Sequence, residues 1–138
     1  MLGEGWTLHL ASRRLILTVE THEHGRPDAE FLADAKVAGV SDSEIETIID
    51  VIAADPSAGD LIPETGGARK VRIGGRGKGK SGGYRVITFY VVDDLPVFLL
   101  RLVSKGQRVD ISRAERYAVR AALTDLVELY RAGLHRHG

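Results

Sequence analysis

A basic, glycine-rich segment at residues 66–85 constrains the fold most, because strand-like residues flank it on both sides. Apolar and cationic residues alternate at 70–73, and a run of apolar and β-branched residues follows at 84–92. The segment therefore predicts a loop held between strand ends. Glycine-rich backbone and clustered cations suit a polyanion. The segment contains seven cations and no acid: Arg69, Lys70, Arg72, Arg76, Lys78, Lys80 and Arg85.

The net charge of zero conceals a strong asymmetry along the chain. Residues 1–65 carry 4 cations and 13 acids, a net charge of −9, whereas residues 66–138 carry 15 cations and 6 acids, a net charge of +9. This asymmetry favours a surface that faces a polyanion; the alternative is that the two halves neutralise each other across the folded surface. The chain has no cysteine and no apolar run long enough to span a membrane, so we expect a soluble, cytoplasmic protein with no membrane partner.

The 138 residues predict one domain at 14–132, with an N-terminal extension at 1–13 and a flexible tail at 133–138. The extension is expected to form either a short extra strand or a loose leader. The expected element order is strand, helix, helix, strand, strand, strand, helix. It predicts an α+β domain with a small, mainly antiparallel sheet of three or four strands, two N-terminal helices and one C-terminal helix.

Capping boxes at Ser41–Glu44 and Ser112–Glu115 predict the starts of the second and third helices. Gly39 and Gly133 predict helix ends. The apolar side of the first helix is expected at Phe31, Leu32, Ala35, Val37 and Ala38, and that of the second at Ile45, Ile48, Ile49 and Ile52. The third helix has these candidate core contacts: Tyr117, Ala121, Leu123, Leu126, Val127 and Tyr130.

Residues 74–81 match the phosphate-binding pattern G-x-x-x-x-G-K-[ST]. That pattern needs a helix that starts at its Lys-Ser pair, since the amides of the helix N-terminus hold the phosphates. Here two glycines and a strand-like run follow Ser81, so the sequence argues against ATP or GTP hydrolysis. The histidines His22, His24, His135 and His137 have no third ligand at a suitable spacing, and we expect neither a metal nor a cofactor.

Two stretches carry a family resemblance. Residues 59–72 read G-D-L-I-P-x-T-G-G-x-R-K-x-R, and residues 77–87 read G-x-G-K-S-G-G-x-R-V-I. Over about residues 14–130 the chain resembles the RelE/HigB toxins of bacterial type II toxin–antitoxin systems, within the RelE/ParE superfamily. The resemblance implies a compact α+β toxin neutralised by a small antitoxin, expected to be a helix-turn-helix protein.

The resemblance also implies an activity, which is ribosome-dependent cleavage of mRNA without a metal, by attack of a ribose 2′-hydroxyl on the adjacent phosphate. It implies contacts to message and rRNA. We expect Arg85, Lys78 and Lys80 to be catalytic, with Arg85 offsetting transition-state charge and either lysine serving as a base. The expected RNA-binding residues are Arg69, Lys70, Arg72, Arg76, Lys105 and Arg108.

Two other functions remain open from the sequence. Relatives of this fold poison DNA gyrase by binding rather than by catalysis, and an inactive toxin would act only as an RNA-binding module. A tyrosine near the C-terminus serves in some relatives, but Tyr117 and Tyr130 both fit core spacing, so neither is assigned that role.

Overall fold

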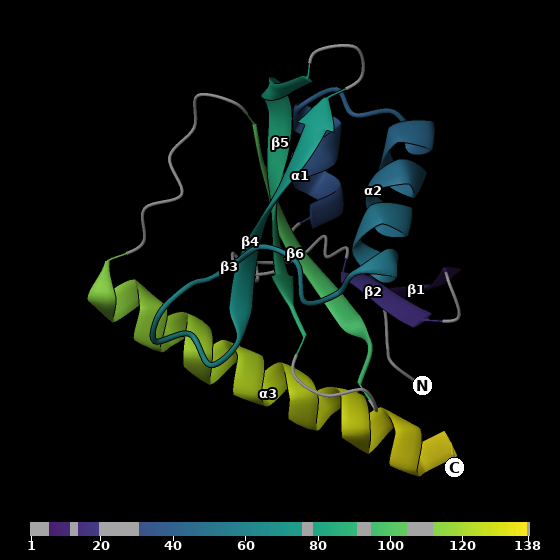
Figure 1. Cartoon of the computed structure of the whole chain (residues 1–138). Coiled ribbons are helices and arrows are strands. Elements are labelled where there is room, and N and C mark those ends of the chain that lie inside the picture. Colours follow the sequence, from purple (N-terminus) through teal and green to yellow (C-terminus); the bar gives the residue numbers. More distant parts are fainter. Residues whose placement is uncertain are drawn as a thin grey trace.

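The computed structural model describes residues 6–11, 14–19, 31–75, 79–90, 95–104 and 112–137. These residues form three helices and six strands (Figure 1). The expected order of helices and strands is confirmed, with β1 and the two-residue β3 as additions. The elements are β1 (Trp6–Ala11), β2 (Arg14–Val19), α1 (Phe31–Val37), α2 (Asp42–Ala54), β3 (Asp60–Leu61), β4 (Ala68–Gly75), β5 (Gly79–Phe89), β6 (Val97–Ser104) and α3 (Arg113–His137).

The described strands lie in a single sheet, in the order β1-β2-β6-β5-β4-β3. Neighbouring strands run antiparallel except β2 and β6, which pair in parallel with Ile16 opposite Val97. Residues 6–11 of the expected extension form β1, which pairs with β2. The α+β class with a mainly antiparallel sheet is confirmed, and β1 and β3 bring the described sheet to six strands.

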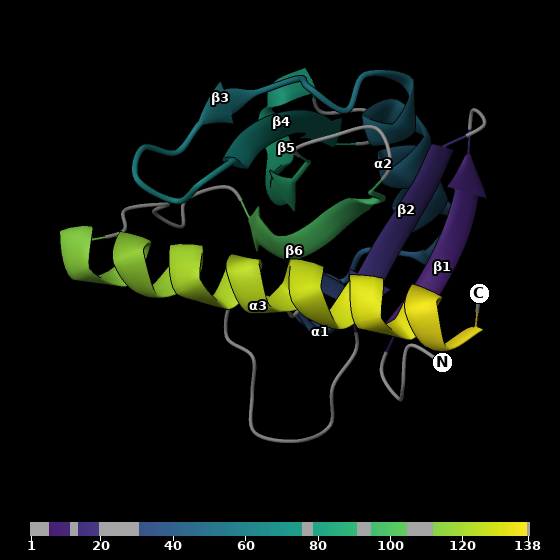
Figure 2. The ribbon, with the colours of Figure 1, turned by 90° about the horizontal axis from the view of Figure 1, so that it is seen from below.

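Helices pack against both faces of the sheet, which explains the apolar composition of its central strands. Val71 and Val86 point to one face and pack with α1 and α2. Ile87 and Phe89 point to the opposite face and pack with α3. Figure 1 shows α1 and α2 together beside the sheet, and Figure 2 shows α3 lying alongside β6.

The second helix forms as its sequence predicts. Ser41 and Glu44 make a complete capping box, in which the Glu44 N–H donates to the Ser41 hydroxyl and the Ser41 N–H donates to the Glu44 carboxylate. Ile48, Ile49 and Ile52 are buried and Ile45 is half-buried. Each fully buried isoleucine contributes about 1.5–3 kcal/mol before the entropy cost of folding.

The first helix matches its prediction in part. Phe31 and Ala35 are buried, and Gly39 ends the helix with a φ of 75°. The expectation that Val37 lies on the apolar side is wrong, since 90% of this residue is exposed. Val37 is the last residue of the helix, where the chain already turns away from the sheet.

The third helix differs most from its expected core contacts. Leu123, Leu126 and Tyr130 are buried, but Tyr117 and Ala121 are exposed, so those two expectations are wrong. The helix also continues through Gly133 to His137 rather than ending at that glycine. Although α3 is 25 residues long, neither it nor the other helices of the described ranges are apolar enough to cross a membrane.

Candidate nucleic-acid interface

Three cations share one face of the hairpin formed by β4 and β5. Arg72 lies directly opposite Arg85 in the strand register. Lys70 is two residues from Arg72 and therefore points to the same side, about 7 Å further along the strand. Arg72 is exposed, whereas Lys70 and Arg85 are half-buried. We call Lys70, Arg72 and Arg85 the basic face.

Hydrophobic alternation fixes the orientation of the basic face. Val71, Ile73 and Val86 alternate with the three cations and are buried against α1 and α2, with exposures of 6%, 6% and 0%. A register slip of one residue would bury the cations and expose these apolar side chains. Burial of these apolar side chains therefore places the three cations on the opposite side of the sheet. The alternation in the sequence predicts this shared side for Lys70 and Arg72.

The basic face carries uncompensated positive charge. Like charges directly opposite each other in a ladder are destabilising, and Arg72 and Arg85 form such a pair. Among the described residues, no carboxylate forms an ion pair with any of the three cations. This arrangement can bind an anion, because a phosphate between the guanidinium groups would replace repulsion by charge-assisted hydrogen bonds.

The structure separates Arg69 from the basic face. Arg69 lies opposite Thr88, and the strand alternation points it toward the face that packs α1 and α2. Its guanidinium donates a hydrogen bond of 3.4 Å to the carbonyl of Gly59. The expected RNA-binding residue Arg69 is therefore not brought together with Lys70, Arg72 and Arg85.

Five other cations were expected to belong to the site. Lys80 belongs to β5, next to Gly79, which pairs with Gly75 across the hairpin. The other four expected cations lie outside the described residues: Arg76, Lys78, Lys105 and Arg108.

Arg101 is a cation that the sequence prediction missed. It lies opposite Ile87 on the same face as Arg85, and its guanidinium donates to the Asp34 carboxylate at 2.7 and 2.9 Å. The Leu102 N–H donates to the same carboxylate at 2.9 Å. The register shifts in this part of the β5–β6 pair, and simple alternation along β6 could not reveal such an irregularity.

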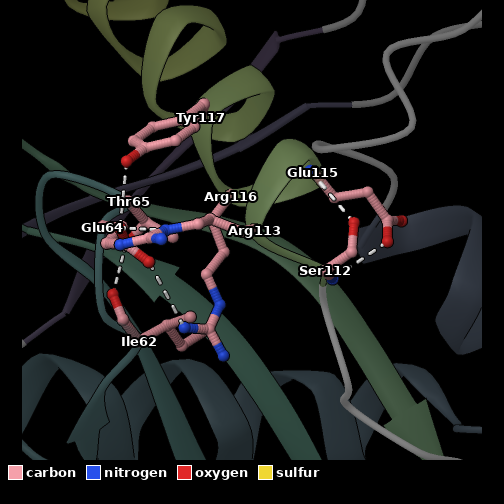
Figure 3. Close-up of polar contacts among 8 residues, drawn as sticks. All are labelled: Ile62, Glu64, Thr65, Ser112, Arg113, Glu115, Arg116 and Tyr117. Atoms are coloured by element: carbon pink, nitrogen blue, oxygen red, sulfur yellow. Dashed lines mark hydrogen bonds and ion pairs between the residues drawn. The ribbon is translucent and has the colours of Figure 1, made fainter.

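The turn before β4 is tied to the first turns of α3 (Figure 3). The Glu64 carboxylate accepts hydrogen bonds from Arg113 Nε at 3.0 Å and from the Tyr117 hydroxyl at 3.1 Å, and Arg116 lies 3.7 Å away. Glu64 has a φ of 66°, a left-handed conformation that is uncommon for residues other than glycine. We call Glu64, Arg113, Arg116 and Tyr117 the Glu64 cluster.

Two further contacts stabilise the ends of this connection. The buried Thr65 hydroxyl donates to the Ile62 carbonyl at 2.7 Å and accepts from the Ala68 N–H at 3.1 Å. At the start of α3, the Ser112 N–H donates to the Glu115 carboxylate at 3.0 Å and, with the Ser112 side chain, lowers the pKa of Glu115. Both predicted capping boxes are therefore present.

The structure argues against a nucleotide-phosphate site at residues 74–81, as the sequence predicts. Ser81 lies inside β5, so no helix begins at the Lys-Ser pair and the amides that such a site needs are absent there. In the part of the chain that the structure describes, no three histidine, aspartate or glutamate side chains lie close enough to hold a metal ion.

A comparison with known protein families identifies the family of this chain. Residues 26–137 match the family described as the RelE toxin of the RelE/RelB toxin–antitoxin system. The matched region includes all of the basic face and the Glu64 cluster and excludes β1 and β2. Toxins of this family pair with an antitoxin. The chain therefore belongs to the RelE family and is the toxin of a toxin–antitoxin pair.

Proposed function

We propose that this toxin cleaves mRNA on the ribosome and thereby inhibits translation, without a metal ion. The observation that carries the proposal is the basic face, where Arg72 opposes Arg85 and Lys70 lies beside them with no carboxylate partner among the described residues. Three cations on one hairpin can hold successive phosphates of a single strand. Their mutual repulsion does not stabilise the fold, so a role in binding explains their placement better.

The proposed reaction needs only the RNA and side chains of the protein. The 2′-oxygen loses its proton and attacks the adjacent phosphorus, forming a 2′,3′-cyclic phosphate. The bond from phosphorus to the 5′-oxygen breaks, and that oxygen takes up a proton. Arg85 stabilises the negative charge that develops on the phosphoryl oxygens, because its planar guanidinium is held by a strand.

The other cations have separate roles in this proposal. Lys70 and Arg72 hold the phosphates of the message on the same face of the hairpin. Lys78 or Lys80 accepts the 2′-hydroxyl proton, since neighbouring cations lower the pKa of a lysine toward neutrality. Arg76, Lys105 and Arg108 would contact message or rRNA phosphates around this site.

Primer extension tests the proposal directly. Purified protein is added to translating ribosomes, and the ends of the message are mapped. We expect discrete cuts within codons, and a loss of about 10²–10³-fold in cleavage rate for Arg85→Ala, the usual effect of removing one donor to a developing oxyanion. Arg120→Ala, which removes an exposed arginine of α3, is the matched control and should cleave at the wild-type rate.

Other results would select another function. Intact message combined with blocked DNA supercoiling would identify a gyrase inhibitor. RNA that binds to the basic face and stays intact would identify an RNA-binding module. Cleavage that Arg85→Ala leaves unchanged would remove Arg85 from the reaction.

A further inference from the structure

The outer side of α2 carries a row of acidic side chains. Asp42, Glu46 and Asp50 are all exposed and recur at every fourth residue, so they follow one side of the helix at intervals of about 6 Å. Within the part of the chain that the structure describes, none of the three forms an ion pair. We call Asp42, Glu46 and Asp50 the acidic stripe.

Helix stability does not account for the acidic stripe. Asp42 lies in the first turn of α2, where the helix dipole favours a carboxylate. Glu46 and Asp50 lie beyond that turn, and like charges four residues apart on a helix repel each other. The last turn of α2 holds no basic residue that could offset them. The acidic stripe and the basic face thus share one property, since each gathers like charges that the described residues leave unpaired.

The acidic stripe and the basic face cannot pair within one molecule, because they lie on opposite sides of the sheet. The helix α2 packs on the side of Val71 and Val86, and the basic face points to the other side. On that other side α3 packs against Ala68 and Phe89, at the end of β4 and β5 away from the hairpin tip (Figure 1). A second molecule is therefore needed to bring the two charges together.

The spacing of charges on the two surfaces matches. Lys70 and Arg72 lie about 7 Å apart along β4, and Arg85 lies opposite Arg72, about 5 Å away. Successive carboxylates of the acidic stripe lie about 6 Å apart. One carboxylate can therefore accept charge-assisted hydrogen bonds from both guanidinium groups while the next carboxylate contacts Lys70.

The charge of the chain favours a second copy as the partner. Each molecule carries both surfaces, so every copy in solution presents the complement that another copy needs. The formal net charge is zero and the isoelectric point is about 7.0, so copies do not repel each other as highly charged proteins do. A partner of another kind that is only acidic would match one of the two surfaces and leave the other unexplained.

We propose that copies of this chain associate head to tail, with the acidic stripe of one copy on the basic face of the next. The two surfaces of this interface differ, so each added copy leaves one basic face and one acidic stripe free for further copies. Ion pairs near water are individually weak and are screened by salt, so the association is weak and reversible.

The consequence of this association rests on the proposed function. A neighbouring copy on the basic face covers the cations that bind message. The associated toxin is therefore inactive until RNA displaces the neighbour.

Sedimentation velocity tests the association with the full chain. We expect assemblies larger than a dimer at about 10 mM salt, where the Debye length is about 30 Å, and monomers at about 1 M salt, where it is about 3 Å. The double variant Glu46→Gln/Asp50→Asn removes charge from the acidic stripe, and Arg72→Gln removes charge from the basic face. Each should raise the dissociation constant at least about tenfold. Asp125→Asn neutralises an exposed acid of α3 and is the control, with an expected change of less than about twofold.

A mixture of the two kinds of variant tests the head-to-tail geometry. The Arg72→Gln variant keeps its acidic stripe and the double variant keeps its basic face, so together they retain one wild-type interface. We expect a one-to-one complex at low salt that does not grow further, although each variant alone associates weakly. The absence of that complex would overturn the proposal.

Three other results would also overturn it: a wild type that stays monomeric at low salt, assemblies that persist in about 1 M salt, or equal association of the wild type and both kinds of variant. Circular dichroism confirms that each variant is folded. A short single-stranded RNA should dissociate the assemblies, and assemblies that bind RNA without dissociating would show that the basic face is not covered. If the wild type assembles as expected but leaves message intact on ribosomes, only the proposed function fails, because sedimentation measures association without RNA.

Discussion

Gly39 and Gly59 adopt similar left-handed backbone conformations but differ in their surroundings. Their φ angles are 75° and 93°. A Cβ atom at Gly39 would meet nothing within 4 Å, whereas one at Gly59 would lie 2.4 Å from the carbonyl oxygen of Lys70. Lys70 belongs to the basic face, so the absence of a side chain at Gly59 lets the chain pass close behind a proposed RNA-binding strand.

We predict that alanine at these two positions has unequal effects. Gly39→Ala should lower the free energy of unfolding by about 1–2 kcal/mol, the cost of a left-handed backbone for a residue with a Cβ. Gly59→Ala should cost more than about 4 kcal/mol, because the β4 backbone must also move. Urea denaturation of both variants measures the two losses in the free energy of unfolding. Equal losses would show that the β4 backbone can move without destabilising the protein.

At the scale of elements, the capped starts of α2 and α3 were predictable and the contacts of α3 were not. A capping box is local, so four residues suffice to read it, as at Ser41 and Ser112. The exposure of Tyr117 depends on where α3 leaves the sheet, which its own periodicity does not record. The hydroxyl of Tyr117 bonds to Glu64, which lies on a turn 53 residues before Tyr117 in the chain. The sequence around Tyr117 therefore does not reveal this partner.

The N-terminal half of α3 should be unusually sensitive to its cap. Ser112→Ala is expected to cost about 1 kcal/mol and to speed hydrogen exchange at residues 116–122, while residues 123–130 stay protected by their burial. Ser41→Ala is the control, because buried isoleucines anchor α2 and its exchange should remain cooperative. Uniformly faster exchange along the whole of α3 would contradict this division of the helix.

The same cap gives α3 a defined response to acid. Hydrogen bonds from the backbone and side chain of Ser112 lower the pKa of Glu115 from its usual 4.5. The folded state therefore binds this proton less readily than the unfolded state. The stabilisation is present above the usual pKa and is lost as the pH falls through the lowered pKa of the folded protein.

At the scale of the whole molecule, the charge asymmetry of the sequence places acidic and basic side chains on opposite sides of the sheet. Acidic residues of α2, among them Asp42, Glu46 and Asp50, are exposed on the helix that packs against one face of the sheet. The basic face lies on the other side of the same sheet. Opposite charge on opposite sides orients an approaching polyanion toward the cations.

RNA binding should therefore depend steeply on salt. If Lys70, Arg72 and Arg85 each neutralise one phosphate of a single strand, log K against log salt concentration should have a slope of about −2, and Lys70→Ala should reduce its magnitude by about 0.7. Lys36→Ala removes an exposed lysine of α1 and should leave the slope unchanged. Fluorescence anisotropy with a short single-stranded RNA gives both values, and a slope that Lys70→Ala does not alter would exclude that phosphate contact.

The sequence was sufficient for the class of fold and for part of the site. Strand alternation predicted that Lys70 and Arg72 share a face, and the apolar residues between them enforce it. The pairing of Arg72 with Arg85 depends on the hairpin register, and Arg101 depends on an irregularity in β6; neither leaves a local pattern.

The parallel pairing of β2 with β6 has a consequence for synthesis of the protein. Strand β2 can pair with β1 at once but must wait about eighty residues for β6, where Val97 lies opposite Ile16, whereas β4 and β5 are adjacent in the chain and can associate as soon as both have left the ribosome. Contacts between distant positions form slowly, since a long loop must close first. The nascent chain therefore assembles its cationic hairpin early and completes the far side of its sheet late.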